Sequence, residues 1–407
     1  MLTKFKFFVI NHMSISLFKK MKNEEVTLVS TEKILERIAR HVGVGEILEK
    51  LASLPSKDLQ SLLLYVYERK ARDYSILDVV NQYSQNRFVT PSAISQKDLI
   101  LFDYLAYSVL PADFVGVELS PVAPFCTNRV LTATDQKKVM TTVRNVEVVA
   151  DPTTVLALEC ARQRSELLRS GLRQNETIKL ATSQRNVRLQ NFEEIPGFTA
   201  HFGIFALTTA GRSIREEMSF ERINLAKHVS FHLSLLELLN RHGFQFDKIT
   251  VSFSDIRITE SLIKQFGLDR KRLGRETQNP DFDFLKESGI PLSSFPSDLG
   301  SLREDRMRSL KIWYFIEALS RIEERVVLDL RERFPGVRFL YDLQRLAGIG
   351  YYTNFCFRIT ATNLNDARYP LVDGGFTDWT QKLLQSRKER LLISGIGSEL
   401  LCQHFRT

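Results

Sequence analysis

The sequence predicts an α+β fold in which an antiparallel sheet is flanked by helices. Short valine-rich or alternating runs, typical of strands, recur through the chain after residue 110. Long stretches with apolar residues at helical spacing lie between these runs. Strands that come in runs with a few long helices among them favour this fold class, with the helices on one side of the sheet. A composition of 43% hydrophobic and 26% charged residues over 407 positions excludes a disordered chain, a collagen and a coiled-coil rod.

The chain is expected to have three parts, at residues 1–22, 23–110 and 111–407. Residues 1–22 form a basic tail that supplies five lysines and no acid to a formal net charge of +8. Because the charge gathers in the tail, it does not by itself indicate a nucleic-acid surface on the folded body. Residues 23–110 form a small helical unit, in which Thr31 and Ser56 are expected to cap amphipathic helices. Its apolar faces make this unit a candidate surface for a protein partner.

The elements of residues 111–407 follow from apolar spacing and turn signals. Helical spacing predicts helices over 153–173 and Arg222–His242, and two more that end at Arg333. The loop at 290–300 contains two prolines and several serines. Alternation or valine content predicts single strands at Val115–Leu119, Val146–Val149, Ile249–Phe253, Val337–Tyr341 and Asn354–Ala361. Residues 177–209 are expected to form two or three antiparallel strands, with a turn around Pro196 and Gly197.

Neither the cysteines nor the histidines indicate a metal site. The four cysteines are far apart and form no C-x-x-C pair, so a reducing cytoplasm is the expected location. His228 and His232 lie one helical turn apart, but no third ligand accompanies them, so we expect packed histidines. No apolar run of about 18 residues is present, which predicts no membrane span.

Three glycine-rich segments near the C-terminus carry a family resemblance. They are Gly348–Asn354, Val372–Asp378 and Leu391–Leu401. Their order resembles the catalytic core of histidyl-tRNA synthetase, a class II synthetase, and of its non-aminoacylating paralogue, the regulatory subunit of ATP phosphoribosyltransferase. The resemblance covers roughly residues 110–402, and nothing similar to an anticodon-binding domain follows Leu401. It also takes in Val117–Pro121 as motif 1, Asp151–Thr154 before a helix, and Phe205–Arg212 as the strand, loop and strand of motif 2.

The resemblance implies a site for a small amino-acid-like ligand. Asp151 and Thr153 match the residues that hold the α-ammonium group in the family. Tyr351, Tyr352 and Thr353 match the lining of the side-chain pocket. A carboxylate facing a small cation, beside aromatic rings, suits such a ligand. The alternative is that Asp151 caps the following helix, with Pro152 at its first position, and that the tyrosines only pack.

The positions that carry arginines in the family have other residues in this chain. A guanidinium binds phosphate bidentately and is always charged. Each lost donor of this kind costs about 3–4 kcal/mol at a transition state, so several losses together predict no adenylation and no ATP or Mg²⁺ cofactor. The positions are Val149, Ala206, Ala347, Phe376 and Leu400, with Thr208 in place of a glutamate.

These observations favour a non-aminoacylating paralogue of histidyl-tRNA synthetase with a regulatory or ligand-sensing role. The resemblance implies a homodimer formed through the motif 1 region. One alternative is an active amino-acid-activating ligase with a rearranged ATP site, in which Arg212, Arg215 or Arg345 contacts phosphate. Another is a tRNA-binding module, which rests on fold analogy and the basic tail.

Overall fold

The computed structural model divides the chain into two compact units, with the division between Tyr74 and Ser75. It describes residues 33–43, 46–132, 134–171, 175–189, 200–213, 218–276 and 282–407. The predicted tail over 1–22, and Thr31, lie outside these residues. The boundary expected at residue 110 differs from the observed one, because α5 (Gln96–Ser108) buries Phe102, Leu105 and Ala106 in the main apolar cluster of the second unit.

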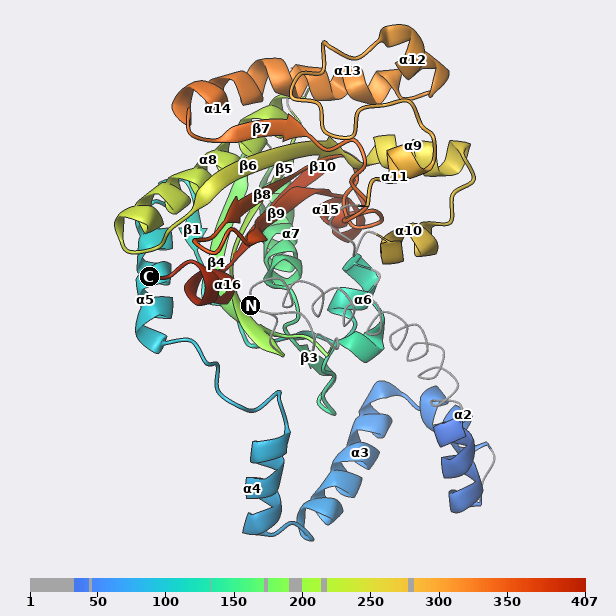
Figure 1. Ribbon diagram of the computed structural model, residues 1–407. Coiled ribbons are helices and arrows are strands. Elements are labelled where there is room, and N and C mark those ends of the chain that lie inside the picture. Colours follow the sequence, from blue (N-terminus) through green and yellow to red (C-terminus); the bar gives the residue numbers. More distant parts are fainter. Residues whose placement is uncertain are drawn as a thin grey trace, which may run out of the picture. The chain divides into compact units, whose positions relative to one another are not determined.

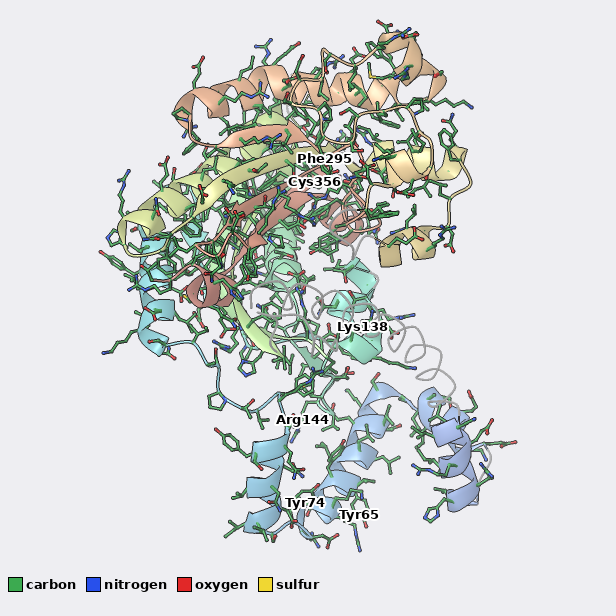
Figure 2. All side chains as sticks on the ribbon, in the orientation of Figure 1. Tyr65, Tyr74, Lys138, Arg144, Phe295 and Cys356 are labelled. Atoms are coloured by element: carbon green, nitrogen blue, oxygen red, sulfur yellow. The ribbon has the colours of Figure 1, made fainter. Side chains whose placement is uncertain are left out.

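The first unit is helical, as expected for this part of the chain. It contains a helix over residues 33–42, α2 (Ile47–Ser53) and α3 (Ser56–Ala71). No residue of α2 or α3 is buried, and Tyr65 of α3 is 57% exposed (Figure 2). Ser56 is the first residue of α3 and not its cap, since Pro55 occupies the cap position without a side-chain hydrogen bond.

The second unit is built on a sheet of eight strands in the order β1-β4-β5-β10-β9-β8-β6-β7 (Figure 1). The pairs β1–β4 and β6–β7 are parallel, and all other neighbours in this sheet are antiparallel. In sheet order the strands are Val115–Gly116, Ile178–Val187, His201–Arg212, Glu389–Gly397, Arg368–Thr377, Phe355–Thr362, Asp247–Asp255 and Arg338–Tyr341. A separate antiparallel pair consists of β2 (Val122–Pro124) and β3 (Val146–Val148).

Helices cover both faces of the sheet, and not one face as the sequence predicted. Successive residues of β5 show the two sides: Thr208 Oγ1 lies 3.3 Å from Cys160 Sγ on α7 (Pro152–Ser170). Thr209 Oγ1 lies 3.0 Å from His228 Nε2 on α8 (Ser219–Arg241). Successive side chains of a strand point to opposite faces. Strands buried on both sides lose the polar alternation that would have revealed the second layer.

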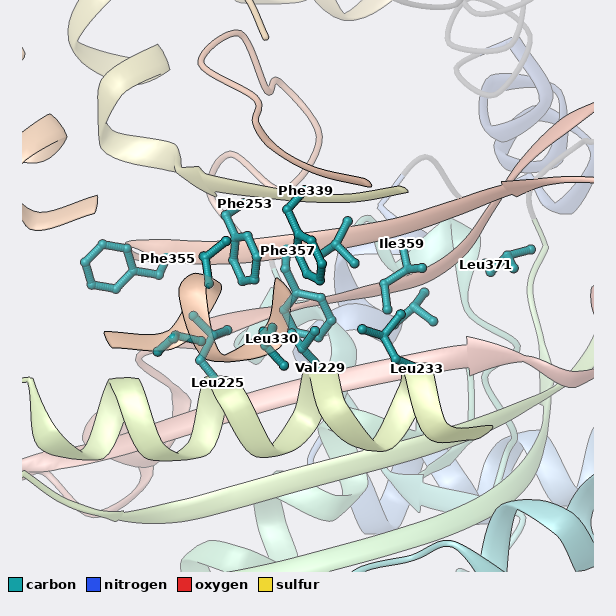
Figure 3. Close-up of a cluster of buried hydrophobic side chains, with 14 of the residues drawn as sticks. Leu225, Val229, Leu233, Phe253, Leu330, Phe339, Phe355, Phe357, Ile359 and Leu371 are labelled. Carbon is teal, nitrogen blue, oxygen red and sulfur yellow. The ribbon is translucent and has the colours of Figure 1, made fainter. Parts of the chain in front are cut away.

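The larger apolar cluster lies on the α8 face. Side chains at helical spacing along α8 point toward aromatic and aliphatic side chains of β6 and β8 (Figure 3). This cluster includes Leu225, Val229 and Leu233 of α8, Phe253 of β6, and Phe357 and Ile359 of β8 (Figure 3).

The remaining helices are short, apart from the α12–α14 region. They are α4 (Ile76–Gln85), α6 (Thr127–Thr132), η1 (Gln136–Lys138), α9 (Ile256–Gln265), α10 (Arg270–Glu276), α11 (Phe284–Glu287), α12 (Glu304–Ser309), α13 (Trp313–Ile322), a π-helical segment (Glu323–Val327), α14 (Leu328–Arg333), α15 (Trp379–Leu383) and α16 (Ser398–His404). Among the described residues, no helix is both long and apolar enough to cross a membrane.

The cysteines are unpaired thiols. Cys160, Cys356 and Cys402 are buried, and Cys356 lies within the sheet of the second unit (Figure 2). Burial raises the pKa of each of these three thiols to about 12. They are therefore protonated and unreactive near neutral pH.

Candidate functional site

Asp151 is the N-cap of α7 and uses its two carboxylate oxygens differently. Oδ1 accepts hydrogen bonds from the backbone nitrogen of Thr153 at 3.0 Å and from its Oγ1 at 2.7 Å. Pro152 follows at the first helical position, where a missing N–H has no cost. Oδ2 accepts from Tyr351 Oη at 2.8 Å. The cap and the link to the tyrosine therefore coexist in one half-buried side chain.

Tyr351 joins the aromatic part of the site to this carboxylate. Burial, together with the negative charge of Asp151, raises its pKa well above the ordinary value. The phenol therefore keeps its proton and acts as a donor. Its ring lies edge-on to Tyr352, with centroids 5.0 Å apart, and edge-on to Trp379 at 5.1 Å. Asp151, Thr153 and Tyr351 thus form one hydrogen-bonded group beside two further rings, here called the Asp151 cluster.

Tyr352 belongs to a neighbouring charged group. Its Oη donates to Asp373 Oδ1 at 3.3 Å, and Arg358 Nη2 donates to Asp373 Oδ2 at 3.2 Å. Arg345 is 3% exposed, donates through Nη2 to Asp373, and donates through Nε to Ala347 O at 2.9 Å. Its guanidinium also lies 5.5 Å from the centroid of the Tyr352 ring. Arg345, a candidate phosphate contact, is therefore buried and held in an ion pair with Asp373, whose side chain is 44% exposed.

Thr353 does not join the Asp151 cluster. Its side chain is exposed, and both its backbone nitrogen and its Oγ1 donate to Phe376 O, at 2.9 and 3.2 Å. These contacts tie the loop before β8 to β9.

The other two candidate phosphate contacts are not placed at the cluster. Arg212 ends β5, and its Nε donates to Glu389 Oε1 at 2.5 Å. Glu389 is fully buried and also receives two hydrogen bonds from Arg164. Arg215 lies outside the described residues.

Motif 2 was assigned to the wrong segment. Phe205 through Arg212 lies entirely within β5, so it cannot form a strand, a loop and a strand. The antiparallel pair at this place in the sheet is β4 with β5, joined by residues 188–200. Arg188 follows β4 directly; its Nε donates to Ala150 O at 2.9 Å and its guanidinium lies 5.0 Å from the Phe202 ring centroid. A cation that the sequence analysis missed therefore lies next to Asp151.

The positions expected to have lost arginines do not line one wall. Ala206 is buried in the apolar cluster on the α7 face, and Val149 is also fully buried. Phe376 packs on the opposite face, where its ring lies 6.3 Å from that of Phe220 of α8. Ala347 is exposed. These positions therefore do not form one surface, since Ala206 and Phe376 lie on opposite faces of the sheet.

His228 and His232 lie in the core, as expected for packed histidines. Both are fully buried, and both bond to Ser394 Oγ, through His228 Nδ1 at 2.8 Å and His232 Nε2 at 2.9 Å. Among the described residues, no group of three His, Cys, Asp or Glu side chains is placed to hold a metal ion.

Solved structures share the architecture of this chain. A structure described as an ATP phosphoribosyltransferase regulatory subunit/histidyl-tRNA synthetase from Bacillus halodurans has a TM-score of 0.55 at 14% identity, over 78% of this chain and 82% of that one. A histidine–tRNA ligase subunit from Alicyclobacillus acidocaldarius has a TM-score of 0.54 at 13% identity, over 77% and 95%. Histidyl-tRNA synthetase from a Nostoc species has 0.55 at 13% identity, over 78% and 73%. The second unit has a class II synthetase-like core. No family model and no curated protein matches the sequence.

The sequence-based resemblance is thus confirmed as a likeness of fold, and identities this low show the fold alone. Around Asp151 and Tyr352, the residues that the sequence analysis missed are Arg188, Asp373 and Trp379. Asp373 stood in the quoted segment Val372–Asp378, and Trp379 follows it directly. Arg188 could have been found by ending the β4 alternation at Val187.

Proposed function

We propose that this chain is a non-aminoacylating relative of histidyl-tRNA synthetase that senses a small amino-acid-like ligand in a regulatory role. The observation that carries the proposal is an asymmetry between two halves of the site. The Asp151 cluster keeps a carboxylate, a hydroxyl and a phenol in contact. Arg212 and Arg345, by contrast, each form an ion pair with a carboxylate of this chain, Arg212 with Glu389 and Arg345 with Asp373.

A ligand ammonium group would bind at Asp151, whose charge is not matched by an ion pair with any described residue. Tyr351 contacts Asp151, the rings of Tyr352 and Trp379 lie against Tyr351, and aromatic faces attract cations. Tyr351 Oη, held in its protonated form, would orient the carboxylate toward the bound group.

Substituting Asp151 with Asn is expected to weaken binding of L-histidine at least about tenfold, because the ammonium loses its counter-charge. Asparagine caps helices as well as aspartate, so the free energy of unfolding should change little. The readout is Trp379 fluorescence, since this ring contacts Tyr351. Asp283→Asn, at the N-cap of α11, is the matched control. Equal affinity in wild type and Asp151→Asn contradicts a ligand at this site.

The purified protein is expected to show no amino-acid-dependent exchange of pyrophosphate into ATP. Arg188 favours the second candidate function, an amino-acid-activating ligase with a rearranged ATP site, because it places one guanidinium beside Asp151. If the wild type shows exchange and Arg188→Ala does not, the protein is an amino-acid-activating ligase and the proposal of a non-aminoacylating protein is wrong. Calorimetry with ATP, with and without the same substitution, measures the binding step separately.

We also propose a homodimer and a protein partner. The dimer is supported by β1 (Val115–Gly116), which stands at the end of the sheet and pairs only with β4 among the described strands. The partner proposal is supported by α3, in which Leu62 and Val66 are 39% and 40% exposed. Sedimentation of the full chain measures the dimer directly, and a monomer at every concentration excludes it.

A further inference from the structure

A cavity lies on the α8 face of the core, on the other side of the sheet from the Asp151 cluster. It has a volume of about 120 Å³ and opens between the first turns of α8 and α9, the helix α13 and the segment entering β8. Pockets for drug-sized ligands are roughly 300–1,000 Å³, so this one suits a much smaller molecule. Its walls include Met218, Glu221, Arg257, Glu317, Asn354 and Phe355.

Two buried acceptor oxygens on this wall lack partners. Glu221 is only 6% exposed; its Oε1 accepts from Arg390 Nε at 3.1 Å, while its Oε2 has no hydrogen-bond partner. Asn354 Oδ1 is likewise buried and without a partner. An unmet buried acceptor costs about 1–3 kcal/mol, so native proteins rarely keep two in one place. The carboxylate of Glu221 therefore keeps an acceptor for a bound ammonium group, which has three donors.

The same cavity also presents positive charge. Arg257 donates to Asp255 through Nε and Nη2, which leaves Nη1 outside that pair. Arg321, also on the wall, lies 3.2 Å from Glu317. A simple cation would face these guanidiniums, and a simple anion would face Glu221 and Glu317. A molecule that carries both charges can place its positive group at the carboxylates and its negative group at the guanidiniums, so it avoids both repulsions.

We propose that this cavity binds a small zwitterion, with its ammonium group at Glu221 and Asn354 and its carboxylate at Arg257. Met218, Ala318 and Phe355 supply an apolar wall for the body of the molecule. The site is distinct from the Asp151 cluster, because Glu221 belongs to α8 whereas Asp151 begins α7 on the other face.

Calorimetry with three matched probes tests the charge requirement. L-norvaline carries both groups, n-butylamine lacks its carboxylate, and pentanoate lacks its ammonium. We expect saturable binding of L-norvaline with a dissociation constant on the order of 1 mM or tighter, and binding at least about tenfold weaker for each singly charged probe. Absence of saturable L-norvaline binding, or equal binding of all three probes, overturns the proposal.

Substitutions locate the site and separate it from the proposed function. Glu221→Gln should weaken L-norvaline binding about tenfold, whereas pentanoate should bind more tightly because the substitution removes a negative charge that it faces. Ala318→Phe adds a ring to the cavity wall from α13, leaves Glu221 and Arg390 themselves unchanged, and should abolish binding, which keeps the test valid if Glu221→Gln folds poorly. Asp151→Asn should leave the affinity unchanged. Loss of binding in Asp151→Asn with retention in Ala318→Phe assigns the ligand to the other face and overturns the proposal.

Discussion

Replacing Glu389 with Gln is expected to lower the free energy of unfolding by about 3–5 kcal/mol, the usual cost of breaking a buried ion pair on one side. Glu389 and Arg164 are both fully buried. Glu389 accepts two hydrogen bonds from Arg164, at 3.0 and 3.1 Å, and one from Arg212 at 2.5 Å. The glutamine leaves the Arg164 guanidinium inside the protein without its counter-charge. Urea unfolding, followed by circular dichroism, measures the change.

Arg164, Glu389 and Arg212 form a charged triad, and its contacts predict how much each variant lowers the free energy of unfolding. Arg164→Met should cost less than Glu389→Gln, because Arg212 still neutralises Glu389. The double variant Arg164→Met/Glu389→Leu should recover part of the loss, since it replaces both fully buried charges with apolar groups and leaves only Arg212, whose side chain is 19% exposed, without Glu389. Asp305→Asn breaks an exposed pair, with side chains 69% and 66% exposed in Arg303 and Asp305, and should change stability by less than about 0.5 kcal/mol. A similarly small effect for Glu389→Gln would mean that water reaches the triad.

Local patterns predicted single elements of this fold better than relations between distant ones. The helix over 153–173 corresponds to α7 and Arg222–His242 to α8, because long amphipathic spacing is a strong signal. β5 misled the motif 2 assignment: buried on both faces, it reads as a continuous run without an interior loop signal. The boundary near residue 110 failed for a related reason, since nothing local separates an apolar helix face that enters the core from one that stays exposed.

In the candidate site, too, the sequence predicted single residues better than contacts between distant ones. Asp151 and Tyr351 lie 200 positions apart, and only the family resemblance placed them together. The partners of Arg212 and Arg345 were missed because an arginine reads alike whether it meets a ligand phosphate or a carboxylate elsewhere in the chain. Glu389 is 177 positions from Arg212, so no spacing rule could have paired them.

Acidification is expected to destabilise the protein strongly through His228 and His232. Burial lowers the pKa of His232 to about 3. Burial also lowers the pKa of His228 well below its ordinary value, and the positive charges of Lys179 and Lys227 act in the same direction. Both rings bond to Ser394 Oγ, and neither forms an ion pair with a carboxylate among the residues that the structure describes.

The sign follows from where the proton binds. Below the ordinary histidine pKa of about 6.5, the unfolded chain binds protons that the folded core rejects. The contribution is therefore fully present above about pH 6.5 and is lost progressively as the pH falls toward the folded-state value. At about pH 4.5, two units below the unfolded pKa, His232 alone should remove roughly 2.7 kcal/mol, and His228 adds to this loss.

The difference between variants isolates this effect from carboxyl groups that titrate in the same range. Burial raises the pKa of Asp103, Glu260 and Asp342, so their contribution has the opposite sign and grows as the pH falls. Free energies of unfolding should be measured from about pH 7 to about pH 4.5 for wild type, His232→Gln and the exposed control His41→Gln. His232→Gln should lower stability at neutral pH but flatten its pH dependence, because the glutamine does not titrate, whereas His41→Gln should keep the wild-type slope. Parallel curves for wild type and His232→Gln would show that the folded core accepts the proton at His232, and the buried network would then have to open on protonation without unfolding.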